Sequence, residues 1–293
     1  MKILLADAFD ASLPETLRKY GEVTADAAQL PEADIVLIRS KTKATKEYID
    51  QAAKMKLIIR GGVGLDNVDV PYCKEKGIVV KNTPEASSVA VAELAFAMMI
   101  AVPNRLIEAH NSMKEGKWLK KELKRTELYG KTLGLNGCGR IGVEVAQRAV
   151  AFGMKVIGYD PVVTKSDYID LKPSLDAMLP LCDYISLHTP VNDQTKGMIN
   201  KNTIAKMKKG VVFVNTGRGK CIIEQDVVDA LMSGQMAAYA TDVWYSDPPA
   251  EDCLLLKAPN MLMAPHIGAS SNENLLRIGK QVDQIIGEFV AGK

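Results

Sequence analysis

Ten short apolar runs alternate with helical patterns along the chain of 293 residues. The runs are rich in β-branched residues and read KILLA (2–6), DIVLIR (34–39), KLIIR (56–60), IVVK (78–81), TLGLNG (132–137), KVIGYD (155–160), YISLHT (184–189), VVFVNT (211–216), AAYATDV (237–243) and NMLMAP (260–265). Strands that alternate with helices form βαβ units, whose crossover connections make neighbouring strands parallel. The sequence therefore predicts an α/β protein with doubly wound parallel sheets.

The composition excludes several classes of protein. Hydrophobic residues make up 47% of the chain and charged residues 25%, which is typical of a globular protein rather than a disordered one. A net charge of +2 gives no reason to expect nucleic acid or a membrane surface as a partner. The five cysteines form no CxxC or Cys/His cluster, so we expect neither disulfides nor a metal site, and a reducing cytoplasm fits best.

The longest apolar stretch, VAVAELAFAMMIAV (89–102), contains Glu93 and is shorter than the roughly 18 residues that a membrane span needs. We expect a buried helix there, within a helical stretch of 85 to 113 that contains the boundary between two domains. The last segment carries apolar residues at helical spacing, but this periodicity leaves open which domain the helix packs on. Near the other end, Ser12 and Glu15 have the spacing of a capping box.

The segment 132–160 has the arrangement of a dinucleotide-binding fingerprint. Gly137, Gly139 and Gly142 follow an apolar strand and open a helix, and a second strand ends at Asp160. The three glycines would allow a tight turn, close approach to a pyrophosphate, and helix–strand packing, in that order. The amides of Arg140 and Ile141 would donate to phosphate oxygens at the helix start.

Asp160 is placed to accept hydrogen bonds from the adenosine ribose. Its charge would repel a 2′-phosphate, and Pro-Val-Val follows it rather than Lys or Arg. The sequence therefore favours NAD over NADP.

The chain has three histidines, and each has a different expected role. His110 lies mid-helix among mixed residues and is interpreted as structural or solvated. His188 ends a strand on the cofactor side and is expected to shape the nucleotide pocket. His266 follows the last strand and is the candidate catalytic base. Arg218 follows a wholly apolar strand, where its planar guanidinium would suit a substrate carboxylate.

These motifs occur together with others along the chain: RGGVGLDNVDV, NTPEASSVAVAELAFAMMIA, LCDYISLHTP, NTGRG, SGQMAAYATDVW and PHIGASS. Together they resemble the D-isomer-specific 2-hydroxyacid dehydrogenase family over about residues 34 to 279. The resemblance implies an NAD-binding Rossmann domain, residues 96–269, inserted into a flavodoxin-like substrate domain made of residues 1–95 and 270–293. It thereby places the last helix on the first domain.

The family's chemistry implies roles for matching positions. His266 would take the 2-hydroxyl proton, and Arg218 would bind the substrate carboxylate together with the amides of Val63 and Gly64. Asp242 would bind the nicotinamide carboxamide. The resemblance also implies a cofactor pocket that includes Thr189, Pro190, Thr216, Gly217, Gly268 and Ala269.

The third catalytic position departs from the family, which usually has Glu there. Counting 29 residues from Arg218 leads to Asp247, whose side chain is shorter by one methylene. Either acid can orient an imidazole, but the shorter side chain requires that the loop moves inward or that the pair is looser. We expect Asp247 to support His266 directly.

The resemblance is greatest to the short-form D-3-phosphoglycerate dehydrogenases of serine biosynthesis. It implies that Arg39 and Ser40 bind a substrate phosphate, and that Ser87 contacts substrate where the family usually has Asn. Two alternatives are a glyoxylate, hydroxypyruvate or general 2-ketoacid reductase, and an NAD-sensing, corepressor-like interaction protein. A homodimer is the family expectation, with a tetramer as an alternative.

Overall fold

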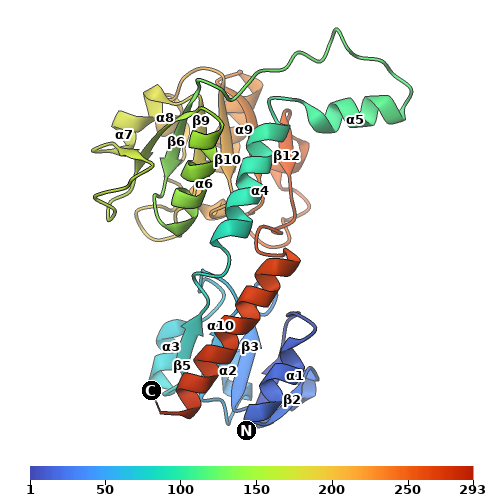
Figure 1. Cartoon of the computed structure of the whole chain (residues 1–293), viewed down its shortest axis with the longest axis vertical. Coiled ribbons are helices and arrows are strands. Elements are labelled where there is room, and N and C mark those ends of the chain that lie inside the picture. Colours follow the sequence, from blue (N-terminus) through green and yellow to red (C-terminus); the bar gives the residue numbers. More distant parts are fainter. Residues whose placement is uncertain (293) are drawn as a thin grey trace. The chain divides into compact units, whose positions relative to one another are not determined.

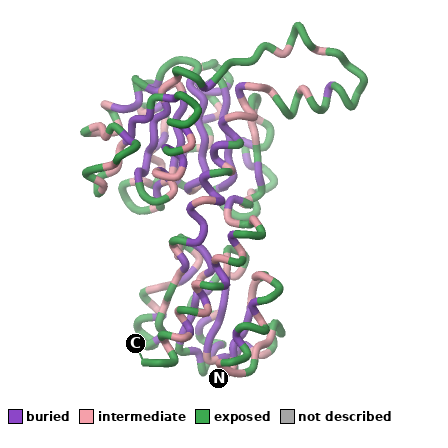
Figure 2. The backbone as a smooth tube through the Cα atoms, viewed as in Figure 1, coloured by how far each residue is buried: buried purple, intermediate pink, exposed green. Residues whose placement is uncertain are grey.

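The computed structural model describes residues 1–292, which form two compact units (Figure 1). Unit 1 consists of Met1–Ala90 together with the residues from Ala269 onward, and unit 2 of Val91–Gly268. In each unit the buried residues follow the strands of a central sheet (Figure 2). Each sheet therefore forms the middle layer of its own unit.

Unit 1 contains a five-stranded sheet in the order β2-β1-β3-β4-β5, and every pairing is parallel. The strands are β1 (Lys2–Leu5), β2 (Glu22–Thr24), β3 (Ile35–Ile38), β4 (Leu57–Arg60) and β5 (Val79–Asn82). The helices are α1 (Leu13–Leu17), α2 (Lys46–Gln51), α3 (Val70–Glu75) and α10 (Asn272–Val290). This strand order is that of flavodoxin-like domains, as the family resemblance implies.

Alternate residues of these strands enter two hydrophobic clusters, one on each face of the sheet. Ile35 and Leu37 pack with residues of α1 and α10, whereas Val36 and Ile38 pack with residues of α2 and α3. In α10, the residues Ile278, Val282 and Ile286 recur at helical spacing and are fully buried on the sheet face that also packs against α1. The helix that periodicity alone did not assign thus belongs to unit 1.

Unit 2 contains a seven-stranded sheet in the order β12-β11-β10-β9-β6-β7-β8, again parallel throughout. The strands are β6 (Thr132–Asn136), β7 (Lys155–Tyr159), β8 (Asp170–Leu171), β9 (Tyr184–Leu187), β10 (Val211–Asn215), β11 (Met236–Thr241) and β12 (Met261–Met263). Six of them have the strand order of a Rossmann fold, and β12 extends the sheet.

Helices cover both faces of this sheet. They are α4 (Ser88–Ala101), most of which belongs to unit 2, α6 (Arg140–Ala151), α7 (Leu175–Met178), α8 (Lys201–Ile204) and α9 (Glu224–Met232). The remaining helix, α5 (Leu106–Lys114), extends away from the sheet (Figure 1). One hydrophobic cluster contains residues of α4 and α6, and another contains residues of α7, α8 and α9. The predicted doubly wound architecture is therefore confirmed.

Two details differ from the sequence prediction. The edge strands β2 and β8 were not among the predicted runs, because their sequences, EVT and DL, are short and largely polar. The prediction of a capping box is also wrong, although α1 does begin at Leu13, directly after Ser12. The Ser12 hydroxyl donates to the carboxylate of Asp10 rather than capping the helix.

All five cysteines are free thiols and buried. Burial raises the pKa of Cys138 and of Cys182 to about 12, so neither forms a thiolate near neutral pH. Among residues 1–292, no group of three or more His, Cys, Asp or Glu side chains could hold a metal ion.

No single helix in the described chain has the length and apolar composition to cross a membrane. Only α4 and α5 taken together meet that test, and they are bent by 65° at the break between them.

Candidate active site and cofactor cradle

The candidate cofactor residues of unit 2 lie at one edge of its sheet. Because all strands are parallel, their carboxyl ends meet there, and ligands of such sheets bind at this edge. The predicted residues follow six of the strands: Gly137 follows β6, Asp160 follows β7, His188 follows β9, Thr216 follows β10, Asp242 follows β11 and His266 follows β12.

The loop between β6 and α6 has the shape that a dinucleotide requires. Gly137 has φ 97°, and a Cβ there would lie 2.8 Å from the carbonyl of His188. A Cβ on Gly142 would lie 2.4 Å from the carbonyl oxygen of Gly137. A Cβ on Gly139 would meet nothing within 4 Å, which leaves open space beside the first turn of α6. The three glycines therefore fit a bound pyrophosphate.

Asp160 ties the end of β7 to this loop. One carboxylate oxygen accepts the Cys138 amide at 2.9 Å, and the other accepts the amides of Val162 and Val163 at 2.9 and 3.1 Å. These bonds fix a negative charge beside the glycine loop. The arrangement fits an adenosine ribose and is unfavourable for a 2′-phosphate.

His188 is held by hydroxyl groups on both sides of its ring. Nε2 lies 2.9 Å from Ser186 Oγ, and Nδ1 lies 3.3 Å from Thr216 Oγ1. Burial lowers the pKa of His188 to about 4. The ring is therefore neutral near pH 7.

Arg218 projects from a loop that packs tightly between two neighbouring strand ends. A Cβ on Gly217 would lie 2.9 Å from Leu187 O, and one on Gly219 would lie 2.1 Å from the carbonyl carbon of Trp244. The Arg218 Nη1 group donates to Gly217 O at 2.7 Å. The flanking glycines thus allow the loop after β10 to fit between those after β9 and β11.

His266 and Asp247 are in direct contact, through Nδ1 of the imidazole and Oδ2 of the carboxylate. The side chains are 28% and 39% exposed, so the pair is reachable from solvent. The contact leaves Nε2 as the ring nitrogen available for a substrate. The shorter acid therefore does reach the histidine.

Asp242 makes a contact that sequence reasoning missed. Its two carboxylate oxygens accept the amides of Ile267 and Gly268 at 2.8 and 2.7 Å. His266, directly before this turn, has φ 56°, a left-handed conformation that is uncommon for a residue other than glycine. Burial raises the pKa of Asp242, and the two amide bonds oppose that shift. Asp242 therefore holds the turn that presents His266.

Trp244 is a second residue that sequence reasoning missed. Its buried indole donates from Nε1 to Ala264 O at 3.1 Å, two residues before His266. It ties the loop after β11 to the end of β12. The signal in the sequence was a tryptophan two residues after Asp242, the candidate site residue that follows β11.

The candidate substrate residues of unit 1 gather at the carboxyl edge of the other sheet. Arg39 and Ser40 follow β3, Val63 and Gly64 follow β4, and Ser87 follows β5. Arg39 donates from Nη2 to Ala269 O at 2.9 Å and from Nη1 to Ala8 O at 3.4 Å. Its guanidinium is therefore held in place by two backbone carbonyls of the same unit.

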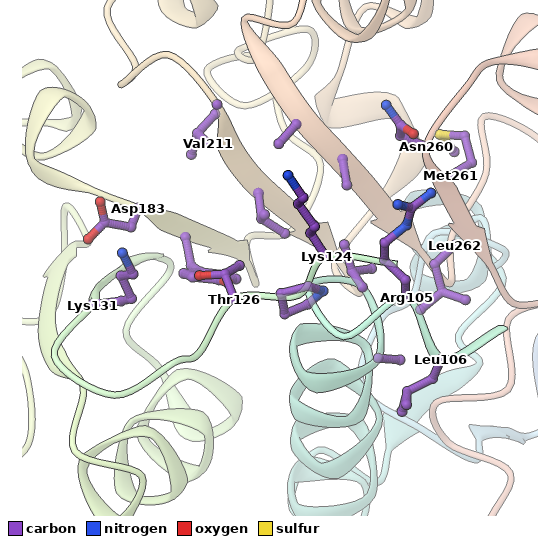
Figure 3. A pocket seen from close by; sticks show the side chains of 18 of the residues that line it. Arg105, Leu106, Lys124, Thr126, Lys131, Asp183, Val211, Asn260, Met261 and Leu262 are labelled. Atoms are coloured by element: carbon purple, nitrogen blue, oxygen red, sulfur yellow. The ribbon is translucent and has the colours of Figure 1, made fainter. Parts of the chain in front are cut away.

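A cavity of about 460 Å³ opens at the amino ends of the unit 2 strands, the edge opposite the glycine loop (Figure 3). It is lined by residues where β10 and β12 begin, such as Val211 and Met261, and by the charged side chains of Arg105, Lys124 and Lys131. None of the predicted site residues lines it.

We expect the buried neutral His188 to make unit 2 less stable in acid. As pH falls, the unfolded chain binds the proton first, near pH 6.5, so stability decreases from there to about pH 4, where the folded protein also binds it. The loss attributable to this residue is at most about 3 kcal/mol. Chemical unfolding of the wild type and His188→Gln across this pH range measures it.

The difference between the two proteins in pH dependence is the informative quantity, because carboxylates titrate in both. Parallel stability curves between pH 6.5 and 4 would contradict the prediction.

Comparisons with known proteins agree with this geometry. Residues 96–268 match the family model described as D-isomer specific 2-hydroxyacid dehydrogenase, NAD binding domain. The chain is 47% identical to a hydroxypyruvate reductase of Thermotoga maritima, over 89% of this chain and 86% of that protein. It is 39% identical to a D-3-phosphoglycerate dehydrogenase of Methanocaldococcus jannaschii, over its whole length but only 58% of that protein's.

Among solved structures, a D-lactate dehydrogenase from Aquifex aeolicus, complexed with NAD and lactic acid, superposes with a TM-score of 0.88 at 30% identity. The match covers 100% of this chain and 96% of that one. Three findings lead to one assignment. The glycine loop fits a dinucleotide, the family model matches more than half of the chain, and the sequence is 47% identical to a relative over 89% of its length. The chain belongs to the D-isomer specific 2-hydroxyacid dehydrogenase family, and its cofactor is NAD.

Proposed function

We propose that this protein interconverts 3-phosphoglycerate and 3-phosphohydroxypyruvate with NAD. The observation that carries the proposal is the position of Arg39 and Ser40 at the carboxyl end of β3, on the same sheet edge as Val63 and Gly64. An arginine fork and a hydroxyl suit a phosphate, and two backbone amides suit a carboxylate. This edge can therefore bind both anionic ends of a three-carbon substrate.

In the proposed mechanism, His266 Nε2 takes the proton from the 2-hydroxyl group, and NAD supplies the acceptor for the hydride from C2. Asp247 holds Nδ1 and stabilises the imidazolium that forms. Arg218 binds the substrate carboxylate and polarises the forming carbonyl. In the reductive direction the same imidazolium returns its proton to the oxygen.

The cofactor contacts that we propose come from the loops at the carboxyl edge of unit 2 and from residues 268–269, where the chain passes from unit 2 back to unit 1. Asp242 would serve the nicotinamide carboxamide while its carboxylate holds the turn after His266. The further proposed contacts are Gly137, Gly139, Arg140, Ile141, Gly142, Asp160, His188, Thr189, Pro190, Thr216, Gly217, Gly268 and Ala269. Ser87, in unit 1, is proposed to contact the substrate.

We expect Asp247→Asn to lower kcat on the order of 10²-fold, since it removes the charge that stabilises the imidazolium. Asp247→Glu should retain more activity than the Asn variant, because it keeps the carboxylate. Steady-state kinetics at saturating NADH measures both. The matched control is Asp252→Asn, an exposed acid of the same loop, which should leave kcat unchanged. Wild-type turnover in Asp247→Asn would exclude the proposed role.

Hydroxypyruvate reduction is the second candidate function. It is favoured by the Thermotoga maritima relative, which is more similar to this chain than the phosphoglycerate dehydrogenase of Methanocaldococcus jannaschii. The two candidates differ in whether the basic end of β3 recognises a phosphate.

We expect kcat/KM to be higher for phosphohydroxypyruvate than for hydroxypyruvate, and Arg39→Ala to remove that preference. A charge-assisted contact contributes about 1.5–3 kcal/mol, or about 10- to 100-fold in kcat/KM. Lys43→Ala, an exposed cation of the same loop, is the control and should leave the ratio unchanged. Equal use of both substrates by the wild type would instead support the hydroxypyruvate reductase.

We also propose that the protein is a homodimer. Figure 1 shows α5 and the segment after it extending away from the rest of unit 2. Apolar side chains on this extension are unusually exposed, with Ile107 and Met113 at 56% and Trp118 at 74%. An apolar arm of this kind is suited to bury its side chains against a second copy of the chain.

Sedimentation or light scattering should give the mass of two chains for the wild type and of one chain for the double variant Met113→Glu/Trp118→Glu. The control is Val162→Glu, at a position 81% exposed elsewhere in unit 2, which should leave the mass unchanged. A wild-type mass of one chain at micromolar concentration would contradict the proposal, and a mass of four would show a tetramer.

A further inference from the structure

A fully buried amide lies in the first turn of α10. Asn274 is 0% exposed, although the neighbouring Asn272 on the same turn is exposed. Burying an amide costs free energy unless its polar groups are hydrogen-bonded. A residue of this kind within an otherwise apolar helix face therefore requires an explanation.

The donor end of this amide is fully used. Nδ2 donates to Ala269 O at 2.8 Å and to Ser87 Oγ at 3.2 Å. The acceptor end is not used, because Oδ1 is buried and has no hydrogen-bond partner among the residues that the structure describes. A leucine or alanine would avoid that cost, so the two donated bonds are what distinguishes asparagine at this position.

The carbonyl of Ala269 connects Asn274 to Arg39. This oxygen accepts Asn274 Nδ2 at 2.8 Å and Arg39 Nη2 at 2.9 Å, so both of its lone pairs are engaged. The guanidinium is otherwise bonded only weakly, through Nη1 to Ala8 O at 3.4 Å, and its Nε is buried without a partner. The position of the Ala269 carbonyl therefore determines where the guanidinium lies.

We propose that Asn274 is a positioning residue for the substrate phosphate site. It fixes the Ala269 carbonyl that orients Arg39, and it holds the hydroxyl of Ser87 through the other proton of the same amide group. One side chain thus positions two of the residues proposed to contact substrate. The inference rests on the proposed function, because it concerns the recognition of the phosphate.

The test compares the substrates with and without a phosphate in a double-mutant cycle of Asn274→Ala and Arg39→Ala. Asn274→Ala should raise KM for phosphohydroxypyruvate about tenfold, the lower end for a bond to a charged group, with little change for hydroxypyruvate or in kcat. In the Arg39→Ala background the same substitution should no longer change the preference between the two substrates, because the phosphate-binding group that it positions is gone.

Two further variants make the result interpretable. Asn274→Ser retains one hydroxyl donor, should give an intermediate KM, and provides the test if Asn274→Ala does not fold. Asn272→Ala, on the exposed side of the same turn, is the matched control and should resemble the wild type.

A merely structural role for Asn274 would change KM equally for both substrates, or add to the effect of Arg39→Ala, and either result would overturn the inference. If Arg39→Ala abolishes the preference for phosphate but Asn274→Ala does not alter it, only this inference fails. If Arg39→Ala leaves the preference unchanged, the proposed phosphate site fails, and the role of Asn274 fails with it.

Discussion

In both sheets every strand runs in the same direction, so all the carboxyl ends of a sheet reach a single edge. Loops that are far apart in the sequence therefore lie beside one another. Polar side chains that follow buried strands are brought together at this edge by the strand direction alone. Unit 2 uses this edge for its glycine loop, Asp160, His188 and the pair of His266 and Asp247. Unit 1 has the candidate substrate residues Arg39, Ser40, Val63 and Gly64 at the corresponding edge.

The precision of the site comes from loops packed against loops. Asp242 fixes the turn after His266 by accepting hydrogen bonds from two backbone amides. Trp244 donates a third hydrogen bond to Ala264 O, at the end of β12. The glycines on either side of Arg218 allow backbone contacts that no larger residue permits. Each of these contacts joins neighbouring strand ends, so the positions of the reactive groups depend on the register of the sheet beneath them.

The apolar runs were sufficient to predict the doubly wound architecture, because buried parallel strands are nearly continuous apolar runs. The glycine spacing likewise predicted the loop between β6 and α6. The roles of Val63, Gly64, Asp242 and Asp247 came from the family resemblance and stay predictions. The sequence did not indicate β2 or β8, since short polar edge strands lack that apolar signal. It also did not indicate the bonds of Asp242 to the amides of Ile267 and Gly268, or the buried amide of Asn274. Those contacts depend on which atoms the folded loops bring within hydrogen-bond distance, and spacing along the chain does not encode that distance.

The buried thiols make the two units separately observable. Cys73 is the one cysteine of unit 1, whereas Cys138, Cys182, Cys221 and Cys253 belong to unit 2. All five are buried, and burial raises the pKa of Cys73, Cys138, Cys182 and Cys253. A thiol reagent therefore reacts with a cysteine only after the unit that contains it has opened. The rate of labelling at Cys73 thus records the opening of one unit, and the rates at the other four record the opening of the other. The native chain carries its own reporters of local unfolding, with no label to engineer.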